Sequence, residues 1–105
     1  KKHPGLKAVG VVHAETSTGV LSNVKELVDV IHEAGALAIV DAVTSLGGHE
    51  VRMDDWGIDV CYSATQKCLG APPGLAPISL SAAAMDVVSN RPTKVQSFYL
   101  DLLLL

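Results

Sequence analysis

Apolar runs alternate with polar segments along this chain, and the segment between the first two runs has the period of a helix. Residues 6–13 (LKAVGVVH) are rich in valine and have the length of a buried parallel strand. Residues 36–40 (ALAIV) form a second such run, which ends at Asp41. Between them, apolar side chains recur at positions i, i+3, i+4 and i+7, namely Val24, Leu27, Val28 and Ile31. Strand, helix and strand within about 35 residues predict a βαβ unit with a right-handed crossover.

The ends of the predicted helix carry their own signals. Asn23 and Glu26 have the spacing of a capping box, in which each side chain satisfies the exposed backbone N–H of the other residue. Gly35 is a typical C-terminal stop. We therefore expect the helix to begin after Asn23, with this residue as its N-cap, and to end before Gly35.

Two further strands and a second helix complete the pattern. Residues 60–62 form a short third strand, and residues 75–80 form a fourth, in which Pro77 indicates an edge or an irregularity. Ser81 is placed to cap a helix over residues 82–88. The tail, residues 98–105, is ambiguous between helix and loop. The fold class that follows from these elements is α/β.

Size and composition narrow the possible classes of protein. A chain of 105 residues makes one domain at most, and 49% hydrophobic against 18% charged residues is the content of a packed core. The net charge of −3 argues against an electrostatic nucleic-acid binder, and no apolar run approaches the roughly 20 residues that span a bilayer. Since the chain starts without Met and stops inside a leucine run, we expect it to be part of something longer.

The two cysteines give no sign of a metal site. Cys61 and Cys68 are seven residues apart, which fits neither a C-x-x-C redox pair nor a zinc knuckle. We expect no metal. Isolated thiols suit a reducing compartment such as the cytoplasm.

Polar residues follow each predicted strand, at the edge where open parallel sheets bind their ligands. The residues concerned are His13, Glu15, Thr16, Ser17 and Thr18 after the first strand, Asp41 after the second, and Ser63, Thr65, Gln66 and Lys67 after the third. If the strands are parallel and adjacent, these groups converge. Of this set, His13 is expected to pack beneath its strand end.

The strand-terminal Asp41 and Lys67, 26 residues apart, are a pair that pyridoxal phosphate would use. Its aldehyde forms a Schiff base with a lysine, and its pyridine nitrogen stays protonated only beside an anion. Hydroxyl and amide groups next to the lysine could bind the phosphate. Spacing alone leaves other sites open, because receiver domains, nucleotide-binding folds and metal sites also place an aspartate at the end of a strand.

Three motifs resemble the middle of a class V pyridoxal-phosphate-dependent aminotransferase, and in particular its alanine:glyoxylate and serine:pyruvate branch. They are residues 13–19 (HAETSTG), residues 40–48 (VDAVTSLGG), and residues 62–67 (YSATQK) followed by 71–74 (APPG). The likeness runs from about Val9 to the end of the chain. It implies part of the large domain of a fold-type I enzyme, with a mostly parallel sheet and flanking helices.

The resemblance also implies a role for each matching residue. Lys67 is the Schiff-base lysine, which also moves a proton between the substrate α-carbon and the cofactor. Asp41 pairs with the pyridinium nitrogen, and Val43 packs against one face of the ring. Thr16 reaches the ring edge near the phenolic oxygen, and Gln66 binds the phosphate.

Members of this family are several times longer than 105 residues. They carry a phosphate-binding loop and a stacking aromatic ring upstream, and a carboxylate-binding arginine downstream. The resemblance therefore implies that residues 1–105 are a partial cofactor-binding domain that is inactive alone. It implies an intact homodimeric enzyme that passes an amino group from alanine or serine to glyoxylate or pyruvate. The compartment expected is the cytoplasm, or a peroxisome or mitochondrion in a eukaryotic host.

Two alternative functions remain open from the sequence. A cysteine desulfurase or lyase of the same superfamily would use the same cofactor pair, but that branch normally has a histidine where this chain has Gln66. A non-catalytic α/β module that binds a nucleotide or a partner protein would need neither Asp41 nor Lys67 for chemistry. Labelling of Lys67 after borohydride reduction separates an enzyme from such a module.

Overall fold

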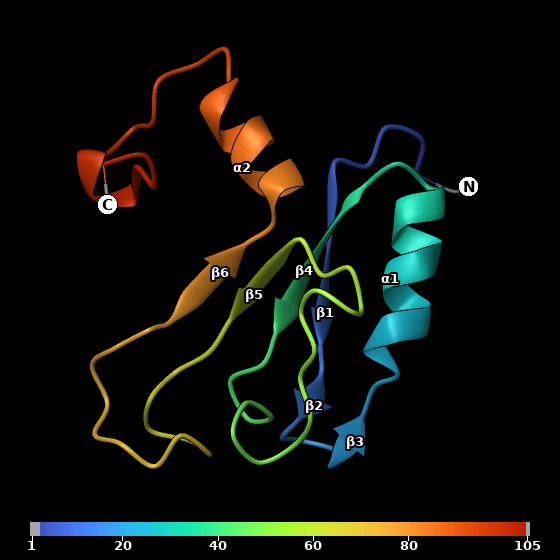
Figure 1. Cartoon of the computed structure of the whole chain (residues 1–105), viewed down its shortest axis with the longest axis vertical. Helices are drawn as coiled ribbons and strands as arrows, with labels where there is room; N and C mark the ends of the chain where they lie inside the picture. Colours follow the sequence, from blue (N-terminus) through green and yellow to red (C-terminus); the bar gives the residue numbers. More distant parts are fainter. Residues whose placement is uncertain (1–2, 105) are drawn as a thin grey trace.

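A computed structural model describes residues 3–104, and its centre is a four-stranded sheet (Figure 1). The strand order is β1 (Ala8–Val12), β4 (Leu37–Asp41), β5 (Val60–Tyr62) and β6 (Ile78–Leu80). Strands β1, β4 and β5 are parallel, and β6 joins the edge in the antiparallel direction. The predicted α/β fold with a mostly parallel sheet and flanking helices is confirmed. Residues 1, 2 and 105 of the predicted segment lie outside the described residues.

The first and fourth strands are shorter than predicted. The first covers Ala8–Val12 rather than residues 6–13, because the chain turns after His13 into a small hairpin of β2 (Ala14–Glu15) and β3 (Val20–Leu21). Gly19, with a φ of 69°, lets the hairpin turn. The fourth strand begins at Ile78 rather than at residue 75, directly after Pro77, which has no N–H to donate.

Helix α1 (Val24–Glu33) covers one face of the sheet, and its N-terminus corrects the sequence prediction. Asn23 makes no side-chain hydrogen bond to the helix, so the expected capping box is wrong. Its backbone ψ is 84°, whereas Ser81 before helix α2 (Ala82–Ser89) has a ψ of 164° and accepts a hydrogen bond from the N–H of Ala84 at 3.1 Å. An N-cap side chain reaches the first turn only from an extended backbone. The predicted stop is confirmed, since α1 ends just before Gly35 with its φ of 73°.

This difference between the two helix starts predicts that replacing the residue before each helix by alanine affects stability unequally. Ser81→Ala should lower the free energy of unfolding by about 1 kcal/mol, the usual cost of removing a side-chain cap. Asn23→Ala should leave it nearly unchanged, because no cap bond is lost. Urea unfolding of both variants measures the difference. Equal losses would contradict the assignment of the caps.

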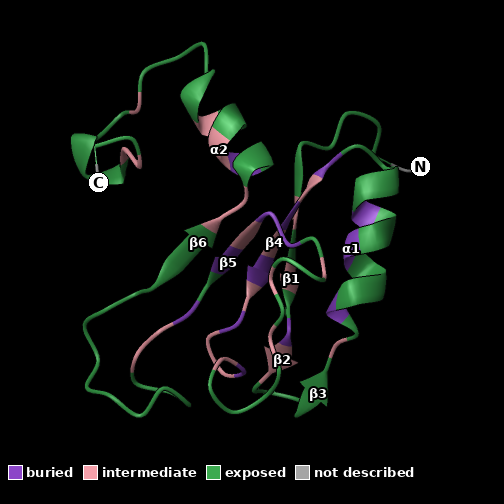
Figure 2. Ribbon diagram, viewed as in Figure 1, coloured by how far each residue is buried: buried purple, intermediate pink, exposed green. Residues whose placement is uncertain are grey.

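The core lies between α1 and one face of the sheet (Figure 2). Val24 and Val28 of the helix pack over Ala38 and Val40 of β4, and Ile58 closes the cluster. All five side chains are at most 2% exposed. Leu27, predicted to belong to the buried stripe, is 41% exposed and lies at its margin.

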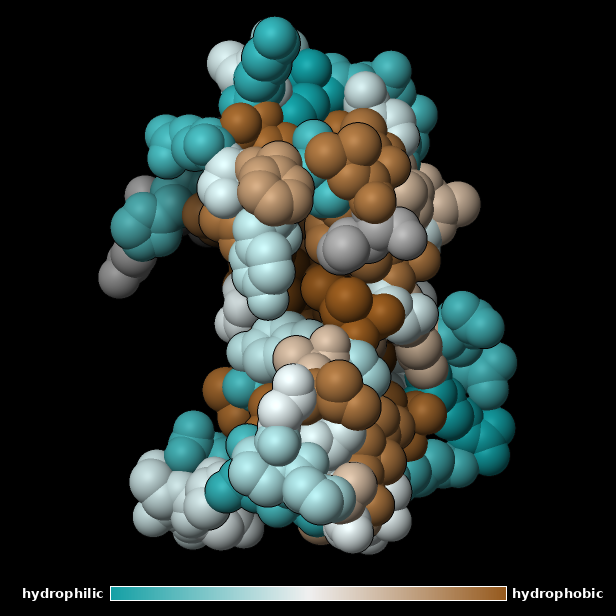
Figure 3. Space-filling model, turned by 90° about the vertical axis from the view of Figure 1, so that its left-hand side faces the viewer, coloured by the Kyte–Doolittle hydropathy of each residue, from teal (hydrophilic) through white to brown (hydrophobic). Residues whose placement is uncertain are grey.

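The rest of the molecule leaves much apolar surface uncovered. Parallel sheets are normally covered on both faces, yet helix α2 contacts the sheet beside the edge strand β6, and the 3₁₀ turn η1 (Phe98–Leu100) lies beyond α2, in the upper part of Figure 1. Figure 3 shows apolar side chains exposed on one face of the molecule. In the whole structure, apolar side chains exposed by half or more include Leu75, Val87, Phe98, Tyr99, Leu100 and Leu104. The radius of gyration is 14.6 Å, above the roughly 13 Å of a compact globule of this length.

We therefore expect the isolated 105-residue chain to associate. Exposed apolar surface of this extent drives proteins together in water. Sedimentation velocity should show dimers or larger species that grow with protein concentration. A monodisperse monomer over the same concentrations would contradict this expectation.

One buried carboxylate connects the sheet to both helices. Asp59, 5% exposed, accepts hydrogen bonds from the N–H of Ala38 (2.8 Å), from Nε2 of His32 (2.7 Å) and from the hydroxyl of Ser81 (3.0 Å). Burial alone would raise the pKa of Asp59, but these three hydrogen bonds outweigh it and hold the pKa below its ordinary value. Asp59 thus ties α1, β4 and the start of α2 together.

The lowered pKa of Asp59 predicts acid sensitivity. In the unfolded chain this carboxyl group binds a proton at a higher pH than in the folded chain, so the stability that it contributes is complete above about pH 5 and falls as the pH drops toward the folded pKa. Urea unfolding between neutral pH and about pH 3 should show this loss. In Asp59→Asn the pH dependence should be weaker. An unchanged dependence would show that other groups cause the acid sensitivity.

Candidate functional site

Three loops meet at the edge of the sheet where β1, β4 and β5 end, at the bottom of Figure 1. They are residues 13–22, 42–59 and 63–77. Between them lies a hollow of about 240 Å³, which we call the Lys67 hollow. Its walls are formed by Val12, Ala14, Glu15, Thr16, Asp41, Val43, Thr44 and Lys67. Four of the five residues to which the resemblance assigned a role are in this set.

Asp41 is held by hydrogen bonds at both of its carboxylate oxygens. It is the last residue of β4, and its carboxylate accepts hydrogen bonds from the N–H of Val43 at Oδ1 (2.9 Å) and from the hydroxyl of Tyr62 at Oδ2 (2.8 Å). Its backbone carbonyl accepts the N–H of His13 (2.9 Å). A carboxylate with one donor on each oxygen has a fixed orientation and keeps further lone pairs for a ligand.

Thr16 comes to the hollow on the β2–β3 hairpin. The hydroxyl of Thr44 donates to the carbonyl of Ala14 at 2.6 Å and fixes the hairpin to the loop after β4. Beside Thr16, the carboxylate of Glu15 accepts the N–H and the hydroxyl of Ser17, which hold the pKa of Glu15 below its ordinary value. Glu15 and Ser17 therefore satisfy each other, and Thr16 lines the hollow between them.

Lys67 lies on the long loop after β5. The loop is fixed at its start by the hydroxyl of the buried Ser63, which donates to the carbonyl of Ala42 at 3.1 Å. The hydroxyl of Thr65 donates to the carbonyl of Pro72 at 2.6 Å, which closes the turn that contains Lys67. Lys67 itself is exposed. An exposed amine on a turn that is held by hydrogen bonds is accessible to a small molecule from solvent.

Two glycines let the loop that follows Asp41 approach the loop that carries Lys67. A Cβ on Gly48 would lie 2.7 Å from Sγ of Cys68, and one on Gly47 would lie 3.1 Å from the carbonyl oxygen of Cys68. Gly47 also has a φ of 91°. A larger residue at position 47 would have both this unfavourable φ and a tight contact with the backbone of Cys68, the residue after Lys67, whereas one at position 48 would first displace the side chain of Cys68.

The fifth predicted residue, Gln66, is not part of the Lys67 hollow. It is exposed, and its neighbour Lys67 lines the wall instead. His13 packs beneath the strand end as expected: it is 3% exposed, its Nδ1 shares a hydrogen bond with the hydroxyl of Ser45 at 3.0 Å, and its ring meets Trp56 edge to face. Burial, and then the nearby His49, lower the pKa of His13.

Sequence reasoning missed Tyr62 as a partner of Asp41. The two residues are direct neighbours in the parallel ladder between β4 and β5, so their side chains lie on the same face of the sheet. The two positions are 21 residues apart in the chain, so the pair could have been predicted only if the register of β4 against β5 had been known.

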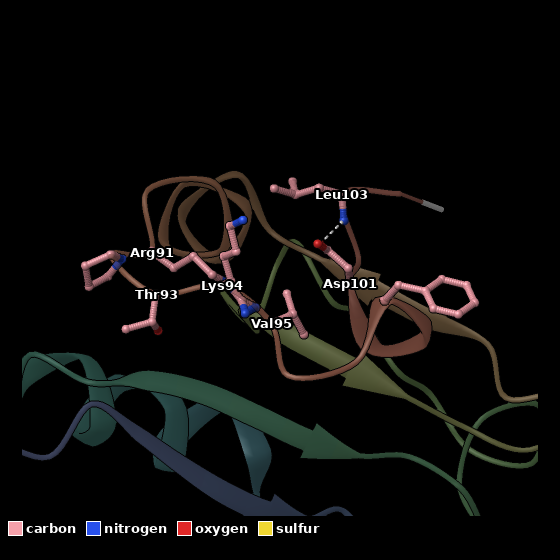
Figure 4. A pocket seen from close by; sticks show the side chains of 8 residues that line it. Arg91, Thr93, Lys94, Val95, Asp101 and Leu103 are labelled. Atoms are coloured by element: carbon pink, nitrogen blue, oxygen red, sulfur yellow. Dashed lines mark hydrogen bonds between the residues drawn. The ribbon is translucent and has the colours of Figure 1, made fainter.

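A larger hollow, of about 450 Å³, lies elsewhere and contains none of the predicted residues (Figure 4). It lies beside the C-terminal segment, where Arg91, Lys94, Phe98 and Asp101 form part of its wall. One oxygen of Asp101 already accepts the N–H of Leu103 at 3.2 Å. Size alone therefore does not mark the functional site in this chain.

Neither a metal cluster nor a membrane span is found in the part of the chain that the structure describes. Among residues 3–104, no three histidine, cysteine, aspartate or glutamate side chains are grouped so that they could hold a metal ion. Within the same residues, no helix has both the length and the apolar character that crossing a bilayer requires.

Comparisons with known proteins agree on one family. The model of the family described as aminotransferase class-V matches residues 3–101. An uncharacterized aminotransferase of Methanocaldococcus jannaschii is 51% identical over 102 residues, which are 97% of this chain and 26% of that protein.

Solved structures give the same result. The alanine–glyoxylate aminotransferase of Nostoc sp. superposes with a TM-score of 0.85 at 44% identity, over 90% of this chain and 25% of that chain. The ureidoglycine–glyoxylate aminotransferase of Bacillus subtilis superposes with a TM-score of 0.86 at 44% identity, over 91% and 25% of the two chains. The chain thus spans about a quarter of the length of the relatives it matches.

Proposed function

The chain belongs to the class V aminotransferase family, and we propose that residues 1–105 are the central cofactor-binding segment of a longer aminotransferase. The observation that carries this proposal is the Lys67 hollow, where the carboxylate at the end of β4, a hydroxyl from the first loop and an amine from the third loop surround one small space. Convergence of these groups at the carboxyl ends of parallel strands is the usual geometry of a ligand site in an α/β fold.

The donor set of the Lys67 hollow fits pyridoxal 5′-phosphate. When bound, this cofactor supplies an aldehyde that condenses with amines and a protonated pyridine ring that withdraws electrons from the substrate α-carbon. Lys67 offers the amine, and Asp41 offers an anion in the same hollow. Val43 gives an apolar surface against which a flat ring can pack.

In this proposal each residue would act on a different part of the cofactor. Nζ of Lys67 would hold the cofactor through its aldehyde and, when free, would carry the proton of the substrate α-carbon. The carboxylate of Asp41 would keep the ring nitrogen protonated, and the hydroxyl of Thr16 would donate to the ring edge. Gln66, which is exposed beside Lys67 and outside the hollow, is assigned to the phosphate.

The proposed reaction moves an amino group from alanine or serine to glyoxylate or pyruvate. Glyoxylate is the acceptor named for both solved relatives, while their donors differ, being alanine in one and ureidoglycine in the other. Small amino and 2-oxo acids are accordingly the substrate class. We further propose a homodimer as the assembly of the intact enzyme, and the cytoplasm, or an organelle of a eukaryotic host, as its compartment.

The test begins with the coding sequence on both sides of this segment. We expect it to continue the aminotransferase sequence, with an anion-binding glycine loop before residue 1 and an arginine for the substrate carboxylate after residue 105. The whole polypeptide, expressed with pyridoxal 5′-phosphate, should then form glycine from glyoxylate with alanine or serine as donor. The 105-residue chain alone should form none. Turnover by the isolated chain, or no turnover by the whole polypeptide with any of these donors, would contradict the proposal.

A further inference from the structure

Tyr62 and Asp41 end two neighbouring strands and face the same side of the sheet. The register of the parallel ladder pairs them directly, and the strands lie side by side in Figure 1. The same cross-strand row continues to Val12 of β1 and to Ile78 of β6. The core cluster lies on the other face, where Val40 and Cys61 form the preceding row. Tyr62 is therefore not needed to fill the core.

The phenol of Tyr62 is hydrogen-bonded to one of the two carboxylate oxygens of Asp41. Its hydroxyl donates to Oδ2 at 2.8 Å, and the backbone N–H of Val43 donates to Oδ1 at 2.9 Å. Almost any residue at position 43 would supply that backbone donor. The donor to Oδ2 exists only because position 62 is tyrosine, since phenylalanine would place the same ring there without a hydroxyl.

Asp41 in turn changes the pKa of Tyr62. The hydrogen bond to Asp41, followed by burial, raises the pKa of Tyr62 above its ordinary value. Tyr62 therefore stays protonated at neutral pH and serves as a donor, not as a base.

We propose that Tyr62 is the positioning residue of this site: it holds the carboxylate of Asp41 in the orientation in which that carboxylate meets the ring nitrogen of the cofactor. Tyr62 does not line the Lys67 hollow and acts through Asp41. The cofactor part of this inference rests on the proposed function. The pairing of Tyr62 with Asp41 does not.

The pairing is tested on the whole polypeptide by absorbance titration of the phenol. The contribution of Tyr62 is the difference between the titration curves recorded with Tyr62 present and with Tyr62→Phe. The titration midpoint of Tyr62 should lie above that of free tyrosine and should fall when Asp41→Ala is added. An equal midpoint with and without Asp41 would overturn the pairing, whatever the cofactor does.

The positioning role is tested on the whole polypeptide by equilibrium binding of pyridoxal 5′-phosphate. Tyr62→Phe should weaken binding by roughly three- to tenfold, the size of one ordinary hydrogen bond, because Tyr62 acts on the cofactor only through Asp41, whereas the matched control Tyr99→Phe should not change it. In an Asp41→Ala background, Tyr62→Phe should have no additional effect, because the two residues act as a unit.

The possible outcomes separate the two hypotheses. A loss that persists at full size in the Asp41→Ala background would assign Tyr62 a merely structural role and overturn the inference. Binding of Tyr62→Phe equal to that of the unmodified polypeptide would overturn it as well. If the unmodified polypeptide binds no cofactor, the proposed function fails together with the cofactor part, and the phenol titration still decides whether Tyr62 and Asp41 are paired.

Discussion

Lys67→Ala should lower amino transfer by the whole polypeptide by roughly three orders of magnitude or more, the scale seen when a covalent catalytic group is removed. Lys67 supplies the amine that lines the hollow beside Asp41. It is exposed on a turn that other residues brace, so its removal should not unfold the chain. The loss should therefore appear in the rate of amino transfer, with circular dichroism unchanged.

The matched control for this prediction is Lys25→Ala. Lys25 is also a surface lysine, but its amine pairs with Asp29 at 2.6 Å on the exposed side of α1, and it is not among the residues that form the Lys67 hollow. Its replacement should leave amino transfer unchanged. Comparable losses in both variants, or activity retained in Lys67→Ala, would contradict the assignment of Lys67.

Asp59→Ala should have the largest effect on stability. The substitution removes the acceptor of three hydrogen bonds and leaves the buried N–H of Ala38 without a partner at that position. An unsatisfied buried donor costs about 1–3 kcal/mol, and the lost bonds from His32 and Ser81 add to this, against a total stability of roughly 5–15 kcal/mol for ordinary domains. The urea midpoint of Asp59→Ala should therefore lie well below that of the unmodified protein.

Asp55→Ala is the control for a carboxylate of the same type at the surface. Asp55 pairs with Arg52 at 3.2 Å, but both side chains are more than half exposed. Surface pairs contribute little, so urea unfolding should distinguish the two variants clearly. Similar unfolding midpoints for Asp55→Ala and Asp59→Ala would show that Asp59 does not connect the elements as described.

The apolar runs and the helical period were sufficient to predict the βαβ unit. The prediction succeeded because the apolar positions of both patterns are buried against each other. Val24 and Val28 on the helix and Val40 in the second apolar run all lie in the core. The convergence of Asp41 and Lys67 followed from topology, since the ends of adjacent parallel strands must meet at one edge.

Other features could not be read from the sequence because they depend on backbone angles or on register. The β2–β3 hairpin has two-residue strands, and Val20 and Leu21 in it are exposed, so no hydrophobic pattern marks it. Asn23 is a good capping residue by type, yet its ψ of 84° points it away from that role. Tyr62 becomes a partner of Asp41 only once the ladder aligns them.

The most direct test of the central claim is the position of the cofactor bond. The whole polypeptide, purified with pyridoxal 5′-phosphate, is reduced with borohydride, digested, and examined by mass spectrometry for a pyridoxyl group. The account predicts this group on Lys67, with loss of the visible absorption band on reduction. A pyridoxyl group on a different lysine, spread over many lysines, or absent would contradict the claim that the Lys67 hollow is the cofactor site.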